Sequence, residues 1–170
     1  MLQKGEMMRA TAASTELVER HRPEILRYLG RMLHDVGDAE DACQDVFLRA
    51  HRAVGRLRAD SNVRAWLYRI ATNRALNVRR SRARAMARVA DVDVDALTAC
   101  TGSAEERADV HAVRRAVESL PPRQRAALVL RRFHGLDYGE IAATLGGNEV
   151  AARANVYQAV KKLRAALGET

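Results

Sequence analysis

The side chains best suited to reading base edges lie in the last helix that the sequence predicts, from a cap at Asn148 to about Leu167. At helical spacing, Val156, Val160 and Leu163 share an apolar stripe with Leu167 and are expected to pack inward. The outward side and its flanks then carry small and hydrogen-bonding side chains: Ala151, Arg153, Ala154, Asn155, Tyr157, Gln158 and Lys161. Guanidinium and amide groups bond to base edges in the major groove, and alanine permits close approach.

A short helix precedes this one, and together they have the pattern of a helix-turn-helix. The segment DYGEIAATL begins at Asp137, with Glu140 three residues on as a capping-box partner, and ends at Gly146 and Gly147. In a helix-turn-helix the second helix enters the major groove. Nearby cations suit phosphates: Arg123, Arg125, Arg131, Arg132, Lys162 and Arg164. A plain amphipathic hairpin is the alternative, but the coincidence of turn, caps and arginines favours DNA binding.

A second nucleic-acid surface is predicted in the N-terminal half. Trp66, Asn73, Asn77 and Arg80 fall on one helical stripe, within a stretch from 61 to 90 that has eight arginines and no acidic residue. An aromatic plane among amides and cations suits unstacked bases, each stacked base contributing roughly 1–3 kcal/mol. The alternative is that Trp66 belongs to the core, which leaves the eight arginines unexplained.

The charge is reversed between residues 35 and 48, where five acidic residues occur without lysine or arginine. An outward-facing stripe is predicted there: Glu40, Asp41, Gln44, Leu48 and His51. DNA would be repelled by this surface, and an exposed leucine among polar residues suits a protein partner. Because single exposed leucines are common, composition leaves the partner open.

Neither catalysis nor metal binding is indicated. The five histidines stand singly, and Cys43 and Cys100 have no metal-ligand or disulfide spacing. The acidic residues that begin at Asp91 imitate a calcium loop, but the required Gly and Glu positions hold Ala96 and Gly102. We therefore expect no enzyme, no metal and no cofactor, and the cysteine usage fits a reduced cytoplasmic setting.

Composition predicts an all-α chain of two small helical domains. The 170 residues include three prolines and 4% aromatics, and a net charge of +8 with a pI near 10.3 indicates a polyanionic partner. The expected domains are 15–88 and 103–170, joined by a short linker over 89–102, where the apolar periodicity is lost. No signal peptide or membrane segment is expected, because no apolar run approaches about 20 residues.

Helix boundaries follow from turn and cap residues. We expect a first helix to break at Gly37 and a second to begin at Asp38. Ser61 or Asn62 should cap a third helix, and Pro122 should open one of four short helices in the second domain.

Three segments resemble a known family, the extracytoplasmic-function sigma factors of bacterial RNA polymerase. They are AEDACQDVFLRAH, WLYRIATNRALNVRR and LPPRQRAALVLRRFHGLDYGEIAATLG, and the likeness extends from about Arg22 to Leu167. The resemblance implies a sigma region 2 helical bundle and a sigma region 4 helix-turn-helix, which direct promoter-specific initiation. The chain departs from relatives at Val150 to Ala152, where many have a Gly-Thr-Val type of sequence, and at Asn77, where many have aspartate.

The resemblance also implies partners for the surfaces above. One helix would dock on the clamp-helices coiled coil of core RNA polymerase through Asp38, Glu40, Asp41, Gln44, Asp45 and Leu48. The promoter −10 element would be melted and held by Arg58, Asp60, Ser61, Asn62, Trp66, Arg69, Asn73, Arg74, Asn77 and Arg80. The −35 element would be read as duplex by the last helix. An anti-sigma factor is a further expected partner.

A rival function is a helix-turn-helix regulator that binds duplex DNA without acting as a polymerase subunit. The C-terminal half alone would allow it. Such a protein needs neither an acidic helix nor a surface for single strands.

Overall fold

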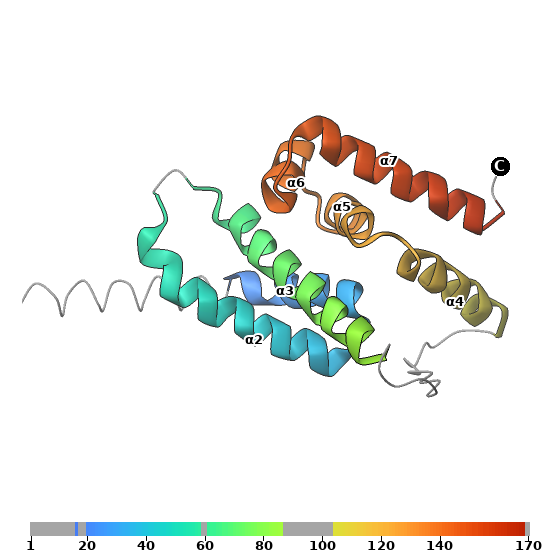
Figure 1. The fold of residues 1–170 in the computed structure, drawn as a ribbon, viewed down its shortest axis with the longest axis horizontal. Coiled ribbons are helices and arrows are strands. Elements are labelled where there is room, and N and C mark those ends of the chain that lie inside the picture. The colour runs from blue at the N-terminus through green and yellow to red at the C-terminus, as the bar shows by residue number, and fades with distance from the viewer. Residues whose placement is uncertain (1–15, 17–19, 59–60, 87–103, 169–170) are drawn as a thin grey trace, which may run out of the picture. The chain divides into compact units, whose positions relative to one another are not determined.

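The computed structural model describes residues 16, 20–58, 61–86 and 104–168, and within these ranges the chain forms helices and no strand (Figure 1). The all-α prediction is thereby confirmed. Two compact units result, residues 1–84 and residues 85–170.

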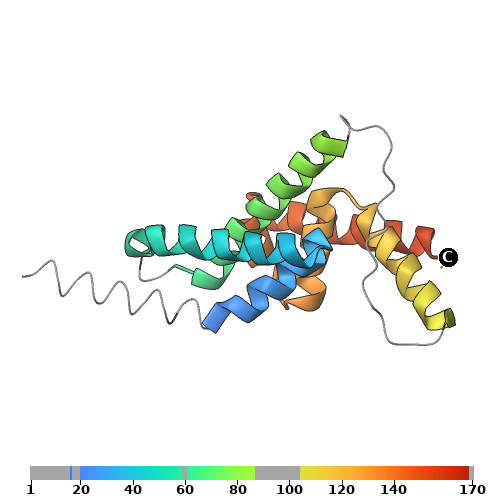
Figure 2. The same ribbon diagram turned by 90° about the horizontal axis from the view of Figure 1, so that it is seen from below.

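Unit 1 consists of a helix over residues 20–33, α2 (Val36–Ala53), the 3-10 turn η1 (Val54–Arg56) and α3 (Val63–Met86). Figure 2 shows the helix over 20–33 beside α2. Their inward faces are apolar and include many alanines, which let helices approach closely. The buried side chains include Ile25, Tyr28, Leu29, Met32, Ala42, Val46, Phe47, Ala50, Leu67, Tyr68, Ala71 and Ala75.

The start of α2 differs from the prediction. The helix begins at Val36, because the Asp35 carboxylate accepts a hydrogen bond of 2.8 Å from the backbone N–H of Asp38 and so caps the first turn. The left-handed residue before it is His34, with φ of 59°, so Gly37 lies inside the first turn and does not break a helix.

Two buried tyrosines join the helix over 20–33 to α3. The hydroxyls of Tyr28 and Thr72 are hydrogen-bonded at 2.7 Å, which satisfies a polar group that would otherwise be costly inside the core. The rings of Tyr28 and Tyr68 meet edge to face, with centroids 5.3 Å apart. Burial raises the pKa of Tyr28, so this hydroxyl stays protonated.

Unit 2 contains α4 (Ala104–Glu118), α5 (Pro122–Phe133), α6 (Tyr138–Leu145) and α7 (Glu149–Ala166). Helix α7 packs on α5 and α6, with Leu128 and Ala159 in a core that Val160 and Leu163 complete. The expectation that Leu167 packs inward is wrong, because α7 ends before it and its side chain is 38% exposed.

Arg125 is fully buried, so the prediction that it contacts phosphate is wrong. Its Nε donates to the carbonyl of Val117 at 2.9 Å, and its Nη2 donates to the carbonyl of Glu118. The last carbonyls of a helix lack partners within the helix. Arg125 therefore closes the end of α4 from inside α5.

We predict that Arg125→Met destabilises unit 2 by about 2 kcal/mol, because the two carbonyls lose charged donors while the apolar volume is kept. Native-state hydrogen exchange of the α5 amides would measure the free energy of opening. The control Arg123→Met removes the same charge from an exposed position in the first turn of α5. Equal effects of the two variants would contradict the role given to Arg125.

Candidate nucleic-acid and protein interfaces

The outward face of α2 has the composition that the sequence predicted. Glu40, Asp41, Gln44 and His51 are exposed, and Leu48 is 50% exposed. Because α2 buries its apolar residues against the rest of unit 1, this acidic face is available to another molecule. We call Glu40, Asp41, Gln44 and Leu48 the acidic face.

Other acidic residues of α2 point toward α3 and form ion pairs with it. Asp45 Oδ2 lies 2.8 Å from Arg74 Nε. Arg82 reaches two carboxylates at the start of α2, with Nε 2.9 Å from Asp38 Oδ2 and Nη2 3.3 Å from Asp35 Oδ2. The hydrogen bond from the Asp38 backbone, followed by the Arg82 guanidinium, lowers the pKa of Asp35.

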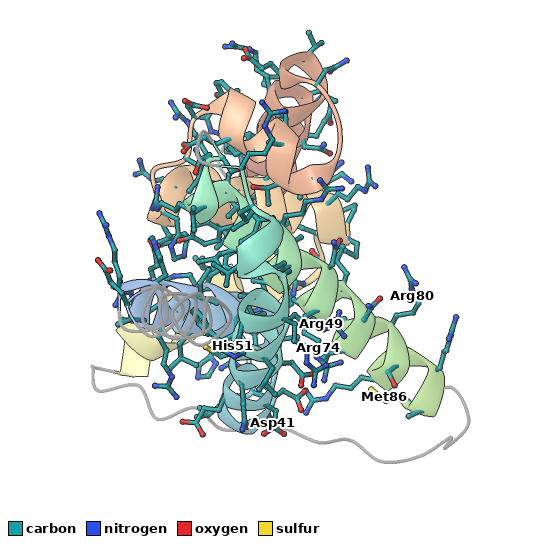
Figure 3. All side chains as sticks on the ribbon, turned by 90° about the vertical axis from the view of Figure 1, so that its left-hand side faces the viewer. Asp41, Arg49, His51, Arg74, Arg80 and Met86 are labelled. Carbon is teal, nitrogen blue, oxygen red and sulfur yellow. The ribbon has the colours of Figure 1, made fainter. Side chains whose placement is uncertain are left out.

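The pairs of Arg74 with Asp45 and of Arg82 with Asp38 are partly solvated, so each contributes at most about 1 kcal/mol to stability. Their main effect is to neutralise charge between α2 and α3 and to hold the paired side chains in place. Figure 3 shows Arg49 and Arg74 together where α2 and α3 adjoin, with Arg80 and Met86 farther along α3. Arg74 therefore faces a carboxylate of the acidic helix, although the sequence grouped it with the DNA-binding arginines.

The exposed side of α3 carries most of the predicted single-strand surface. Arg69, Asn73, Asn77 and Arg80 are exposed, and Trp66 is half-buried. Trp66 is thus neither fully buried nor fully exposed. On α3 it lies on the same stripe as Asn73, Asn77 and Arg80. Aromatic stacking beside phosphate-binding arginines is a common way to hold unpaired bases.

The segment before α3 is described in part. Arg58 and Asn62 are exposed and Ser61 is half-buried, whereas Asp60 lies outside the described residues. The Asn62 side-chain oxygen accepts a 2.9 Å hydrogen bond from the Ala65 backbone N–H, so Asn62 caps α3. Of the two caps that the sequence allowed, Asn62 is the one used.

Glu24, in the helix over 20–33, binds two residues near the start of α3, and the sequence did not predict this role. Its Oε2 accepts from Arg64 Nε at 3.1 Å and from the Tyr68 hydroxyl at 3.2 Å, and its Oε1 lies 2.6 Å from His21 Nδ1. The Arg64 guanidinium also lies over the Tyr68 ring. Partial burial raises the pKa of Glu24, but His21 and Arg64 outweigh it and lower the pKa overall.

We predict that Glu24→Gln lowers the free energy of unfolding of unit 1 by about 1 kcal/mol near neutral pH. A carboxyl whose folded pKa is lowered stabilises the fold above its unfolded pKa, and that contribution is lost as the pH falls through the folded pKa. The gap between the two proteins should therefore shrink between about pH 6 and about pH 3. Urea unfolding followed by fluorescence of Trp66, the single tryptophan, measures it. Glu16→Gln, which removes an exposed carboxylate elsewhere, is the control; a gap that is constant with pH would contradict the prediction.

The helix-turn-helix of unit 2 is built from local caps. Asp137 accepts from the Glu140 backbone at 2.8 Å, and the Glu140 carboxylate accepts from the Asp137 backbone at 3.0 Å, which completes the predicted capping box. Gly146 ends α6 in the left-handed region, with φ of 70°. Asn148 then caps α7 through a 2.8 Å bond from the Ala151 backbone.

The outward face of α7 agrees with the helical periodicity. Ala152 and Ala159 are buried and fix which side faces the core. Asn155 is half-buried, and the other predicted −35 residues are exposed: Ala151, Arg153, Ala154, Tyr157, Gln158 and Lys161. We call these seven side chains the α7 face.

One member of the α7 face is held by a residue of α6. The Arg153 guanidinium carbon lies 4.4 Å from the centroid of the Tyr138 ring, and that of Arg131 lies 4.9 Å from the same centroid. Arg131 also donates to the Leu136 carbonyl at 3.0 Å. Tyr138 was missed in the sequence because only the fold brings it to Arg153.

Within the residues described, no three His, Cys, Asp or Glu side chains gather as a metal site would require. No helix among them has the length and apolar character needed to cross a membrane. Cys43 is buried, and burial raises the pKa of its thiol.

Comparison with known families matches both units. The family described as Sigma-70 region 2 matches residues 17–85, and Sigma-70, region 4 matches residues 111–163. The RNA polymerase sigma-H factor of Pseudomonas aeruginosa is 34% identical over 165 residues, which cover 89% of this chain and 84% of that protein. The ECF RNA polymerase sigma-E factor of Escherichia coli K12 is 33% identical over 172 residues, covering 93% and 86% of the two chains.

Solved structures share the fold. The sigma factor RpoE of Bartonella quintana, in complex with the anti-sigma factor NepR, has a TM-score of 0.72 at 24% identity and covers 91% of this chain and 96% of its own. CnrH in complex with the cytosolic domain of CnrY has a TM-score of 0.70 at 25% identity, with coverages of 93% and 89%.

Proposed function

Because this chain belongs to the extracytoplasmic-function sigma factors, which direct RNA polymerase to promoters, we propose that its two units divide the contacts of initiation between them. The observation that carries the proposal is the opposite charge of two adjoining faces, the acidic face of α2 and the basic side of α3. The region 2 domain spans 15–88, the linker 89–102, which lies outside the described residues, and the region 4 domain 103–170.

Core polymerase binding is assigned to α2. The acidic face offers two carboxylates, an amide and an exposed leucine, a combination suited to a cationic and partly apolar protein surface such as a coiled coil. Asp38 and Asp45 complete this surface at its α3 side, where both carboxylates stay partly exposed. Their ion pairs with arginines of α3 hold α2 in a fixed orientation toward the promoter-binding side.

The −10 element is assigned to α3 and the segment before it. Trp66 offers a ring for an extruded base, Asn73 and Asn77 offer amides, and the arginines follow the phosphates of the opened strand. The full set is Arg58, Asp60, Ser61, Asn62, Trp66, Arg69, Asn73, Arg74, Asn77 and Arg80. The acidic face repels DNA, so the strand is confined to one side of unit 1.

The −35 element is assigned to the α7 face. Arg153, Asn155 and Gln158 carry hydrogen-bonding groups for base edges, and Ala151 and Ala154 permit close approach or contact with a thymine methyl group. Lys161 is placed for a phosphate. A duplex-binding regulator would use the same face, but it would leave the acidic face and the region 2 match without a purpose.

The remaining assignments follow from the family. A sigma factor is a non-catalytic subunit, and its place is the cytoplasm, where bacterial RNA polymerase works. We include an anti-sigma factor among the partners, since RpoE of Bartonella quintana binds one and has the same fold.

Transcription from purified components tests the proposal. Core polymerase plus this chain, given a library of promoter fragments, should initiate on a subset whose transcripts share −10 and −35 sequences. Core polymerase alone should not. A chain that binds duplex DNA yet confers no initiation would overturn the proposal in favour of a regulator.

We predict that Asp41→Lys weakens binding to core polymerase about ten-fold, because it reverses a charge in the middle of the acidic face. Binding of the isolated chain to duplex DNA should stay within about two-fold of wild type. Fluorescence anisotropy measures both affinities. Glu16→Lys makes the same change of charge at an exposed site outside the acidic face. Equal losses of both affinities, or equal effects of both variants, would count against the assignment.

Two arginines of α3 allow a second test, on the opened strand. Arg80 is exposed and takes part in none of the ion pairs found among the described residues, whereas Arg82 is held by Asp35 and Asp38. We predict that Arg80→Gln reduces the slope of log affinity against log salt for single-stranded −10 DNA by about 0.7, the value for one phosphate contact. Arg82→Gln should reduce it less. Holoenzyme titrated at several salt concentrations gives both slopes, and the reverse order would contradict the assignment.

A further inference from the structure

Tyr138 lies outside the α7 face, yet its ring is in contact with Arg153 of that face. We infer that Tyr138 is a positioning residue, which holds the Arg153 guanidinium for recognition of one base pair of the −35 element. The inference rests on the proposed −35 role of α7 and deepens it. It assigns a specificity role to α6, the helix that does not enter the groove.

The contact is close enough to orient the arginine. The Arg153 guanidinium carbon is 4.4 Å from the ring centroid, well inside the distance of about 6 Å at which a cation is attracted to an aromatic face. A guanidinium stacked on a ring keeps its N–H donors in the plane of the group, so they stay available to base acceptors. Stacking thus restricts the side chain without using its hydrogen-bonding capacity.

The position of the Tyr138 ring is restricted by its surroundings. Tyr138 is the first residue of α6 and lies inside the capping box that Asp137 and Glu140 form. The Arg131 guanidinium approaches the same ring at 4.9 Å and is tied to the Leu136 carbonyl. The cap bonds therefore fix the backbone that carries Tyr138, and the ring lies between the guanidiniums of Arg131 and Arg153.

The side chain of Glu149 in α7 also lies beside the first turn of α6. A Cβ added to Gly139 would lie 3.2 Å from Glu149 Oε1 and 3.3 Å from Asp137 Oδ1, closer than ordinary contact. Glu149 is the first residue of α7. Helices α6 and α7 adjoin, and the short turn from Gly146 to Asn148 limits how far Tyr138 can lie from Arg153.

Ordering Arg153 before DNA arrives favours base discrimination. A free arginine loses much of its rotamer freedom on binding, whereas a stacked one has lost it already. An unheld arginine would also reach neighbouring phosphates, which carry no sequence information. Loss of the ring should therefore reduce selectivity for sequence more than it reduces total affinity.

The experiment uses holoenzyme and a duplex library randomised over the −35 element of a promoter that the wild-type holoenzyme transcribes. Arg153→Ala should abolish the base preference at one position. Tyr138→Leu should lower the preference at that same position roughly two- to five-fold, the range for an exposed cation–aromatic contact. Tyr138→Phe, which keeps the ring and loses the hydroxyl, should retain the wild-type preference. Tyr138→Leu combined with Arg153→Ala should equal Arg153→Ala alone.

Several outcomes would overturn the inference. Wild-type selectivity in Tyr138→Leu, with reduced selectivity in Arg153→Ala, would contradict it. A lower total affinity of Tyr138→Leu with selectivity intact would also contradict it, because that is the effect of a purely structural residue. A further loss in the double variant would mean that Tyr138 contacts DNA on its own. If Arg153→Ala itself changes no preference, the −35 role of Arg153 fails, and the positioning role fails with it.

A measurement without DNA tests the contact separately. In the full chain, the NMR signal of the Arg153 Nε–H group should show a ring-current shift in the wild type and in Tyr138→Phe, and none in Tyr138→Leu. Absence of the shift in the wild type would overturn the contact, whatever the DNA results.

Discussion

The ion pairs between α2 and α3 are the constraint on which unit 1 depends. Arg82 spans the two carboxylates at the start of α2, and Arg74 meets Asp45 about two turns farther along. Small buried residues allow the helices to come close, while these pairs fix how one is turned about the other. The carboxylates of Glu40 and Asp41 lie on the outward side of α2, where Arg49 and Arg52 are also exposed, and guanidiniums lie on the outward side of α3. In the proposed assignment, a protein partner and a nucleic-acid strand would approach this bundle from different sides.

In unit 2, helix caps and a buried arginine, not ion pairs between helices, determine how the outward-facing helix is placed. Its helices are short, so local caps and one buried cation define their ends. Arg125 satisfies the carbonyls at the end of α4, and the capping box sets the first turn of α6. With the ends of the helices fixed in this way, α7 presents an undistorted outer face. The placement of α7 thus depends on surface cap residues and on one buried arginine, none of which belongs to the α7 face.

Much of this could be predicted from sequence, because caps and periodicity are local signals. Asp137 and Asn148 mark the starts of their helices by hydrogen bonds to residues three positions on, and the spacing of Val156, Val160 and Leu163 predicts which side of α7 is outward. Contacts between distant residues leave no such signal. Glu24 and Arg64 are 40 residues apart, and nothing in either neighbourhood predicts that they meet.

The arginines illustrate the same limit. Sequence shows that they are numerous but does not show which are buried or paired. Arg125 was therefore assigned to phosphate although it is fully buried, and the ion pair of Arg74 with Asp45 was not foreseen. The predicted start of α2 was wrong for a related reason. The Asp35 side chain caps a helix that begins at Val36, so Gly37 lies within the helix and does not precede it.

The turn between α6 and α7 has a consequence for how such a protein diverges. Gly146 in the left-handed conformation is separated by a single residue from the Asn148 cap, so there is no spare length between the two helices. An inserted or deleted residue would shift α7 relative to α6 and move the side chains of the α7 face away from their present positions. If the α7 face reads the −35 element, as proposed, a new promoter preference is expected to arise by exchange of side chains on this face, with the length of the turn kept.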